Sequence, residues 1–234
     1  MDRMNFETWE PAYEAILADF GFDRAADERA RDVAATLATP FPTGRLSVLA
    51  DATVAIAGAG PSLSDADALD RAADADAVVA ASTAVDVLAE AGIAVDVMVT
   101  DLDKNPGTAM RLSEAGTPVA AHAHGDNVSA VREWFPRFEA EHVLATTQAA
   151  PCGPVVNVGG FTDGDRAAFL ADHAGAAALR FVGWDFADPT VSGTKARKLE
   201  WAARLLHWLE RRRGERFEIL DGRRSELSIP WATD

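Results

Sequence analysis

The sequence contains one cysteine, Cys152, in 234 residues. A single cysteine excludes an internal disulfide and any zinc site built from several thiolates. The sequence also has no apolar run approaching the roughly 20 residues that a membrane-spanning helix needs. The first residues lack the apolar segment of a secretory signal. We therefore expect a cytoplasmic protein without a membrane partner.

Lysine is scarce, since the chain has only Lys104, Lys195 and Lys198. With 22 basic and 37 acidic residues, the formal net charge is −15 at pH 7. Proteins bind duplex nucleic acid through clustered Lys and Arg, so we expect no nucleic-acid partner. A surface this acidic repels itself at low salt and is screened at high salt. We interpret it as adaptation to a high-salt cytoplasm; the alternative is an acidic protein with a basic partner.

The first part of the chain is predicted to be helical. Apolar residues recur at helical spacing between Phe6 and Phe20, and an alanine-rich segment follows as far as Leu37. Pro40 and Pro42 then end the helical pattern. Because these helices carry no cluster of chemically active groups, we expect residues 1–45 to form a helical cap on the main domain.

From Thr53 onward, short apolar runs alternate with helical segments, which predicts a mostly parallel sheet with helices on both faces. We therefore expect a Rossmann-like three-layer α/β domain over residues 50–222, with a long helix over about 195–213. The expected strands cover residues 54–57, 77–81, 95–100, 118–124, 142–147, 155–158, 179–184 and 217–220.

Polar or glycine-rich turns follow four of the expected strands. They are Gly58-Ala59-Gly60, Asp101-Leu102-Asp103, His124-Gly125-Asp126-Asn127 and Asp163-Gly164-Asp165. In a parallel sheet these turns lie along the same edge, which is where open α/β sheets bind ligands. Each turn taken alone also has a plain structural interpretation, as a tight turn, a solvated turn or a helix cap.

Asp101 and Asp103 are the strongest candidates for a metal site. Residues two apart in an extended chain point to the same side, and two adjacent carboxylates repel unless a cation lies between them. Oxygen ligands favour Mg²⁺, with Asp126 as a third expected ligand. A solvated turn is the alternative. His122 and His124 share a strand face, but no third nitrogen or sulfur ligand is near in sequence, so we expect hydrogen-bonding roles for both.

A magnesium site beside a glycine turn indicates a nucleotide polyphosphate as ligand. The turn from Gly58 to Ser62 is expected to offer backbone N–H groups to phosphate, with Ser64 capping the next helix. This turn lacks the third glycine of the dinucleotide-binding motif. The expected protein cations are Arg166 and the group Lys195, Arg197 and Lys198 at the start of the long helix. A solvated helix face is the alternative for that group.

Six motifs occur in an order that resembles one known family. They are Gly58-Ala59-Gly60-Pro61-Ser62-Leu63, Thr100-Asp101-Leu102-Asp103, His122-Ala123-His124-Gly125-Asp126-Asn127, Gly160-Phe161-Thr162-Asp163-Gly164-Asp165-Arg166, Gly183-Trp184-Asp185-Phe186 and Lys195 to Leu199. Over roughly residues 50–213 the chain resembles the archaeal 6-hydroxymethyl-7,8-dihydropterin pyrophosphokinases, the MptE-like family. This family is distantly similar to thiamine pyrophosphokinase and differs in fold from the bacterial pterin enzyme.

The resemblance implies an enzyme that uses ATP and Mg²⁺ to make a pterin diphosphate and AMP, for folate or methanopterin synthesis. The expected catalytic residues are Asp101, Asp103, Asp163, Asp165 and Lys195. The expected substrate-binding residues are Gly58, Gly60, Ser62, His124, Asp126, Asn127, Arg166 and Lys198. The flat pterin would suit an aromatic such as Phe161 or Trp184.

The chain departs from the family pattern at two turns. Ala81-Ser82-Thr83-Ala84 stands where members commonly carry Ala-Asp-Gly-Ala, and Lys104 replaces a glycine after Asp103. Two other function classes remain open, since Asp-x-Asp also anchors the metal of glycosyltransferases, and the chain could be a non-catalytic nucleotide-binding domain. The sequence leaves both a monomer and a homodimer open.

Overall fold

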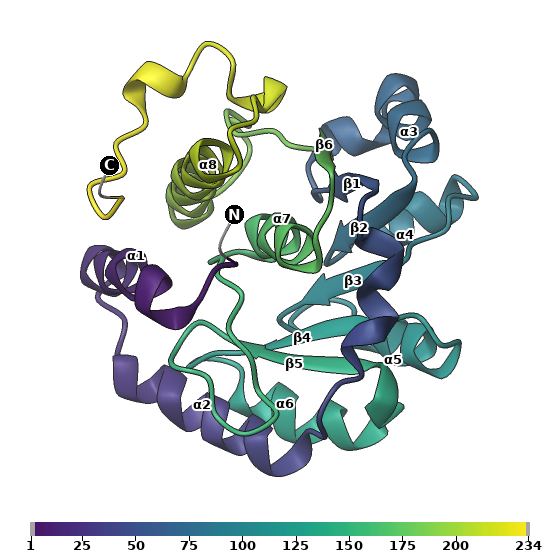
Figure 1. The fold of residues 1–234 in the computed structure, drawn as a ribbon, viewed down its shortest axis with the longest axis vertical. Coiled ribbons are helices and arrows are strands. Elements are labelled where there is room, and N and C mark those ends of the chain that lie inside the picture. The colour runs from purple at the N-terminus through teal and green to yellow at the C-terminus, as the bar shows by residue number, and fades with distance from the viewer. Residues whose placement is uncertain (1–2, 233–234) are drawn as a thin grey trace.

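The computed structural model describes residues 3–232 and contains a six-stranded parallel sheet in the order β5-β4-β3-β2-β1-β6 (Figure 1). The strands are β1 Thr53–Ala57, β2 Ala77–Ala81, β3 Val97–Thr100, β4 Val119–Ala123, β5 Val143–Thr147 and β6 Ala178–Val182. The expected Rossmann-like α/β fold with an N-terminal helical cap is confirmed. Nearly all strand residues are buried, because helices cover both faces of the sheet.

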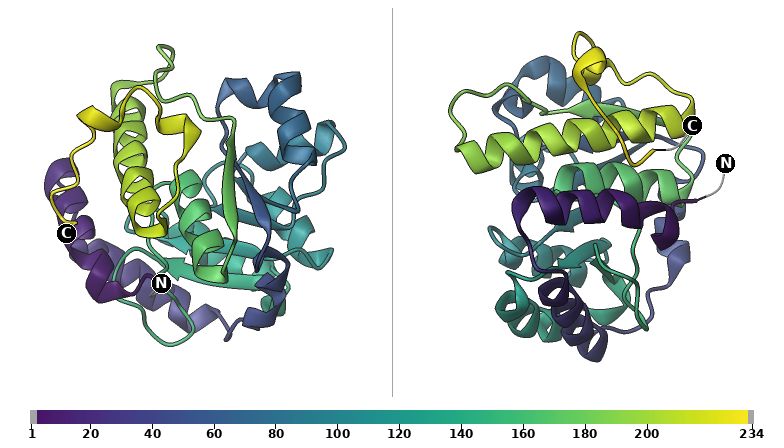
Figure 2. Two further views of the ribbon diagram at one scale, coloured as in Figure 1. Left: turned by 45° about the horizontal axis from the view of Figure 1, so that its top comes forward. Right: turned by 90° about the vertical axis from the view of Figure 1, so that its left-hand side faces the viewer.

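The helices form two layers (Figure 1). One layer contains α1 Phe6–Phe20, α7 Asp163–Ala174 and α8 Gly193–Arg213, which run side by side in Figure 2. The other contains α2 Arg24–Leu37, α3 Ala66–Ala73, α4 Ala84–Glu90, α5 Pro106–Glu114 and α6 Val128–Trp134. The N-terminal arm, α1 and α2, therefore passes around the β5 edge of the sheet and contributes one helix to each layer.

The two layers pack on alternate residues of the same strands. Val54 and Ile56 of β1 belong to the core under α7 and α8, while Ala55 and Ala57 face the second layer. This alternation is the two-residue period of a strand. The buried apolar residues that α2, α3 and α5 contribute to this layer are alanines, namely Ala30, Ala34, Ala72 and Ala109.

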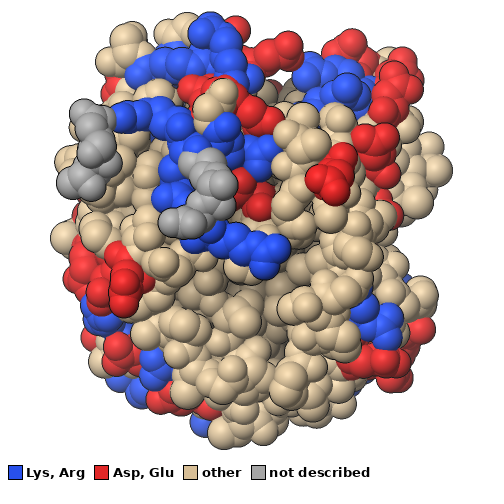
Figure 3. All heavy atoms as spheres, in the orientation of Figure 1, with Lys and Arg blue, Asp and Glu red and all other residues tan. Residues whose placement is uncertain are grey.

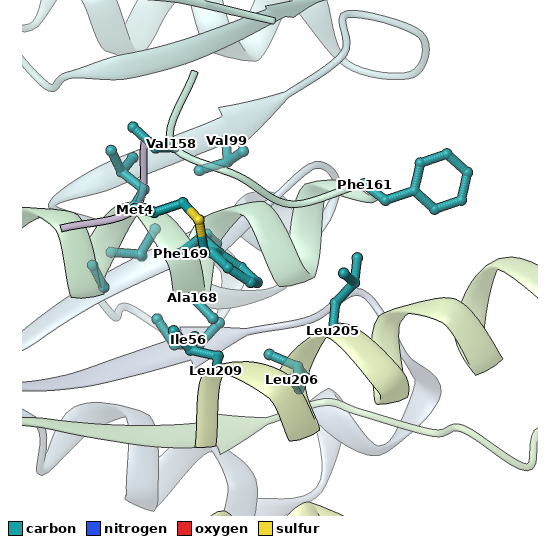
Figure 4. Packing of buried hydrophobic residues seen from close by; sticks show 14 of the residues in the cluster. Met4, Ile56, Val99, Val158, Phe161, Ala168, Phe169, Leu205, Leu206 and Leu209 are labelled. Atoms are coloured by element: carbon teal, nitrogen blue, oxygen red, sulfur yellow. The ribbon is translucent and has the colours of Figure 1, made fainter. Parts of the chain in front are cut away.

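Phe169 of α7 lies at the centre of the larger core (Figure 4). Its ring centroid is 6.2 Å from that of Trp9 in α1 and 6.1 Å from that of Trp208 in α8. All three side chains are buried. This aromatic cluster fixes α1 and α8, which come from opposite ends of the chain, against α7.

Two of the expected strands are wrong. Residues 155–158 form only single bridges, from Val156 to Thr146 and from Val155 to Cys152, because the Pro/Gly-rich turn before them directs the chain away from β5. In place of a last strand, Glu218–Leu220 is a short 3-10 helix. Its apolar residues pack inward instead of pairing, with the Phe217 ring 4.8 Å from that of Phe181.

The expected helix start at Ser64 is also wrong. Pro61–Ser64 is a 3-10 turn, and α3 begins after Asp65, which is its N-cap residue. The glycine turn and the 3-10 turn together lead the chain to the side of the sheet that is covered by α2 to α6, and α3 starts there.

Basic side chains gather over α8 and the segment that follows it (Figure 3). Ion pairs hold two of them in place, Arg213 to Asp172 at 2.5 Å and Arg224 to Glu210 at 2.8 Å. These pairs fasten the end of α8 to α7 and to the C-terminal segment. No helix within residues 3–232 is both long and apolar enough to span a bilayer.

Replacing Phe169 by alanine should lower the free energy of unfolding by about 3–5 kcal/mol, because it leaves a cavity between three helices. Urea unfolding followed by tryptophan fluorescence measures this. The matched control is Val48→Ala, which removes an exposed apolar side chain and should change stability by less than about 0.5 kcal/mol. Equal effects of the two substitutions would contradict the central role of Phe169.

Candidate active site at the carboxyl end of the sheet

A cavity of about 480 Å³ lies across the carboxyl ends of the strands. The turns after β1, β2, β3, β4 and β6 each contribute lining residues, namely Gly58, Ser82, Asp101, His124 and Trp184. The chain leaves β1 toward α3 and leaves β6 toward α8, on opposite faces of the sheet. The cavity therefore includes the point at which neighbouring strands diverge to opposite layers, the usual ligand site of open α/β sheets. Its volume is in the range of small-molecule sites.

A tight turn brings Asp101 and Asp103 together. The amide of Asp103 donates to Oδ1 of Asp101 at 3.3 Å, and the amide of Leu102 donates to Thr100 Oγ1 at 3.0 Å. Leu102 has a φ of 68°, which is uncommon for a non-glycine residue, and its side chain is anchored in the core. The two carboxylates thus converge through a strained turn, and the expected extended backbone at this position is wrong. Such strain is typical of functional sites.

Asp163, the first residue of α7, adds a third carboxylate to the pair. Burial and the negative charge of Asp101 raise the pKa of Asp163 to about 8. Burial and the neighbouring Asp101 likewise raise the pKa of Asp103 to about 6. Burial opposes ionisation of Asp101 as well, but hydrogen bonds from His124 and Asp103 hold its pKa below the usual range. The cluster therefore resists carrying three negative charges without a cation.

The donor set of this cluster fits a hard divalent cation, since it consists of carboxylate oxygens. Over residues 3–232, no three His, Cys, Asp or Glu side chains are already gathered in the arrangement of a metal site. Asp126 lines the same cavity and is exposed. Its role as a third ligand remains a prediction.

Two residues expected to bind substrate hold other site residues in place. The Asn127 side chain donates to the carbonyls of Asp101 and His122, both at 2.7 Å, and accepts from the amide of His124. Asn127 is buried and does not line the cavity; its contact with substrate stays a prediction. His124 lines the cavity, and its Nε2 lies 3.7 Å from Asp101 Oδ2.

Asp165 was expected to be catalytic, but its carboxylate caps α7. It accepts the amides of Phe161 and Thr162, at 2.5 and 2.9 Å, and the hydroxyl of Thr162. The side chain is completely buried and does not line the cavity. Asp163 alone of this pair lines the cavity, and the catalytic role of Asp165 stays a prediction.

Three amides of the glycine turn that were expected to face phosphate are paired within the chain. The amides of Gly58 and Gly60 donate to the carbonyls of Val182 and Gly183, both at 2.9 Å, and that of Ser62 donates to Asp185 at 3.0 Å. A Cβ atom at Gly60 would lie 2.3 Å from the Asp185 carboxylate, so glycine is required for this close approach. Gly58 and Gly60 still line the cavity, whereas Ser62 does not.

Three of the expected cations line the cavity, and a fourth cation joins them. Lys195, Lys198 and Arg166 face it, together with Lys104. Burial and the positive charge of Lys104 lower the pKa of Lys195. Arg166 is buried and donates to Asp163 at 3.2 Å and to the carbonyl of Phe161 at 2.9 Å. Arg197 instead forms an ion pair with Asp19 of α1 at 2.7 Å.

The N-terminal arm supplies site residues that the sequence did not reveal. Phe22 lies in the turn between α1 and α2, Asp27 lies in α2, and both line the cavity. Asp27 accepts the amide of Gly125 at 2.8 Å. The burial of Asp27 could have been inferred from its spacing, because Asp27 lies on the same face of α2 as buried Ala30 and Ala34.

Comparison with known proteins decides the family. Residues 34–190 match the family described as 6-hydroxymethylpterin diphosphokinase MptE-like. The chain belongs to this family. Its expected resemblance is thereby confirmed, and the matched region contains the carboxylate cluster and the turns after β1 to β4 and β6.

Relatives in this family extend over most of the chain. Proteins named 6-hydroxymethyl-7,8-dihydropterin pyrophosphokinase from Methanothermobacter thermautotrophicus and Pyrococcus furiosus are 36% and 37% identical to it. These matches cover 92% and 88% of this chain, and 99% and 95% of the relatives. A protein of the same name from Methanocaldococcus jannaschii is 29% identical over 88% of this chain and 96% of its own length.

The raised pKa of Asp163 predicts a pH-dependent stability. Folded protein keeps this proton up to about pH 8, whereas an unfolded chain releases it near pH 4. The folded state therefore binds more protons in this range, and the free energy of unfolding should fall as the pH rises toward 8, by at most about 1.4 kcal/mol per pH unit. Asp163→Asn should remove this component.

Urea unfolding without divalent cations, between about pH 5 and pH 9, measures this effect. The stability of the wild type relative to Asp163→Asn should decline with pH and level off above about pH 8. Asp67→Asn makes the same change at an exposed position of α3 and should keep the wild-type slope. A constant difference between the wild type and Asp163→Asn would contradict the shifted pKa.

Proposed function

We propose that this protein transfers the diphosphate group of ATP to the hydroxymethyl oxygen of 6-hydroxymethyl-7,8-dihydropterin, releasing AMP. The observation that carries the proposal is the meeting of carboxylates and lysines in one cavity. Asp101, Asp103 and Asp163 lie on its acidic side, and the lysines after β3 and at the start of α8 line it as well. A divalent cation neutralises the carboxylates, and a polyphosphate neutralises the lysines. Either ligand alone would leave one of these two groups without a counter-charge.

Asp101 and Asp103 would hold Mg²⁺, with Asp126 as a third ligand. When bound, the ion neutralises phosphate charge and orients the group that is transferred. The carboxylates have the oxygen donors this ion prefers, and the raised pKa of Asp103 indicates a site that gains from a cation.

The protein side chains position the two substrates and move one proton. A bond forms between the hydroxymethyl oxygen and the β-phosphorus, and the bond from that phosphorus to the oxygen bridging it to the α-phosphate breaks. Lys195, Lys198 and Lys104 neutralise the phosphate oxygens as AMP departs. The hydroxyl proton passes to the ionised form of Asp163, which must first lose the proton it holds up to about pH 8; a divalent cation beside the carboxylate favours that ionised form.

The structure also accounts for the departure at Ser82. Its φ of 51° lies in the left-handed region, which Asn and Asp tolerate better than most residues. Aspartate, the residue common in the family, therefore fits this backbone, and serine keeps a polar group here without adding negative charge beside Asp101. We propose that the loss of this carboxylate is compatible with the reaction.

The test combines the purified protein with ATP, MgCl₂ and 6-hydroxymethyl-7,8-dihydropterin and measures AMP and pterin diphosphate. Asp101→Asn should lower kcat/KM by about 100-fold or more, because it removes a ligand charge from the site. The control, Asp67→Asn, should match the wild type. Wild-type protein that forms no AMP would refute the proposal.

The same assay distinguishes the other two function classes. Release of a nucleoside diphosphate from a nucleotide sugar, with indifference to pterin, would indicate a glycosyltransferase. ATP binding without turnover that survives Asp101→Asn would indicate a non-catalytic domain.

A further inference from the structure

Three buried polar atoms that line the cavity lack a hydrogen-bond partner within the described residues. They are Ser82 Oγ, His122 Nε2 and Arg166 Nε. The three side chains are only 5%, 1% and 3% exposed, respectively. Buried polar groups in folded proteins nearly always have a partner. A bound ligand is therefore expected to provide partners for at least some of these atoms.

The hydrogen bonds around His122 define what its free nitrogen can bind. We assign the one proton of Thr146 Oγ1 to the carbonyl of Ala121, 3.4 Å away, which makes the hydroxyl the acceptor from His122 Nδ1 at 3.0 Å. Burial and the charge of Arg166 lower the pKa of His122, which keeps the ring neutral. With the proton on Nδ1, Nε2 has a free lone pair. It accepts an N–H or O–H group and cannot pair with ionised phosphate oxygens.

Asp27 offers a second acceptor to the same cavity. Its carboxylate accepts from Tyr13 at 2.8 Å, from Gln148 Nε2 at 2.7 Å and from the amide of Gly125 at 2.8 Å. A carboxylate has about four acceptor positions, so one remains. Asp27 is 4% exposed and lines the cavity, so that position is available to a ligand.

Aromatic rings complete this part of the cavity. Phe22 is 37% exposed although it is a large apolar side chain at the cavity rim. Its ring centroid lies 6.5 Å from that of Phe161, which also lines the cavity. Exposed aromatic surface beside buried acceptors suits a flat ring that carries N–H groups. We call Phe22, Asp27, His122 and Phe161 the arm-side half.

The sheet order separates the arm-side half from the rest of the cavity. His122 lies at the end of β4, whereas Gly58 and Trp184 follow β1 and β6. β3, with Asp101 and Asp103 directly after it, lies between them in the sheet. The carboxylate cluster thus lies between two halves of the cavity.

We propose that the arm-side half binds the ring of the acceptor pterin, whose N–H groups donate to His122 Nε2 and Asp27 while its face packs on Phe22. This assignment rests on the proposed function and leaves the half around Trp184 to the nucleotide. The aminopyrimidinone edge of a pterin carries adjacent N–H donors, which match a carboxylate and a neutral imidazole nitrogen. The N-terminal arm is then a determinant of substrate specificity.

Separate binding measurements for the two substrates test this assignment. One titration follows the intrinsic fluorescence of 6-hydroxymethylpterin, and calorimetry follows α,β-methylene-ATP with Mg²⁺. Phe22→Ala and His122→Phe should each raise the Kd for the pterin about tenfold or more and leave the nucleotide Kd within about twofold. Val48→Ala, which also shortens an exposed apolar side chain, should change neither Kd.

A ligand-side comparison identifies the Asp27 contact. In 6-hydroxymethyllumazine an oxygen replaces the 2-amino group, so the wild type should bind it about tenfold more weakly than the pterin. Asp27→Asn should reduce this discrimination, because an amide can donate to the new oxygen. Discrimination that is the same in the variant and the wild type would refute the contact.

Turnover by the wild type distinguishes a failure of the subsite assignment from a failure of the proposed function. If the wild type makes pterin diphosphate, but Phe22→Ala and His122→Phe lose nucleotide binding and keep pterin binding, the subsite assignment alone is overturned. Unchanged pterin affinity in Phe22→Ala would also overturn it, and this variant alters an exposed residue, so it should fold. Wild-type protein without pterin turnover would refute the proposed function, and the subsite assignment with it.

Discussion

Electrostatic repulsion among three carboxylates is the constraint around which the site is built. Asp101, Asp103 and Asp163 are held close enough that two of their pKa values are raised, to about 6 and about 8. Folding does not favour such an arrangement, so other interactions must enforce it. Asn127 holds the Asp101 carbonyl, buried Leu102 holds the turn, and the Asp165 cap fixes the start of α7. The polar residues nearest the carboxylates serve mainly to keep them together.

Some polar residues in the sequence motifs line the cavity, whereas others form hydrogen bonds within the protein that hold the site in place. Asp165, Asn127 and Ser62 stand in motifs that look chemically active, yet their polar atoms are satisfied by neighbouring backbone and side chains. Each such motif contains residues that line the cavity and at least one residue that supports them. The sequence does not distinguish the lining residues from the supporting ones, because residue spacing does not determine the direction of side chains in a turn.

The fold could be predicted from sequence much further than the site. Buried strands such as β2 and helices such as α5 are local patterns, so apolar runs and Pro/Gly boundaries identify them. The errors at residues 155–158 and 217–220 arose where apolar residues pack inward without a strand partner. The contribution of Phe22 and Asp27 depends on contacts across the whole chain. Asp27 and Gly125 are 98 residues apart, and no local pattern reports such a contact.

The placement of α1 has a consequence for the order in which the protein is made. A ribosome releases the N-terminal arm before α8, but Asp19 pairs with Trp201 and Arg197, at separations of 182 and 178 residues. The ring of Trp9 likewise packs on Trp208. α1 must therefore wait for α8 before its docking is complete. A nascent or truncated chain that lacks α8 has no partners for Asp19 and only the α7 part of the surface on which Trp9 packs, so the docking of α1 is completed only after α8 has been made.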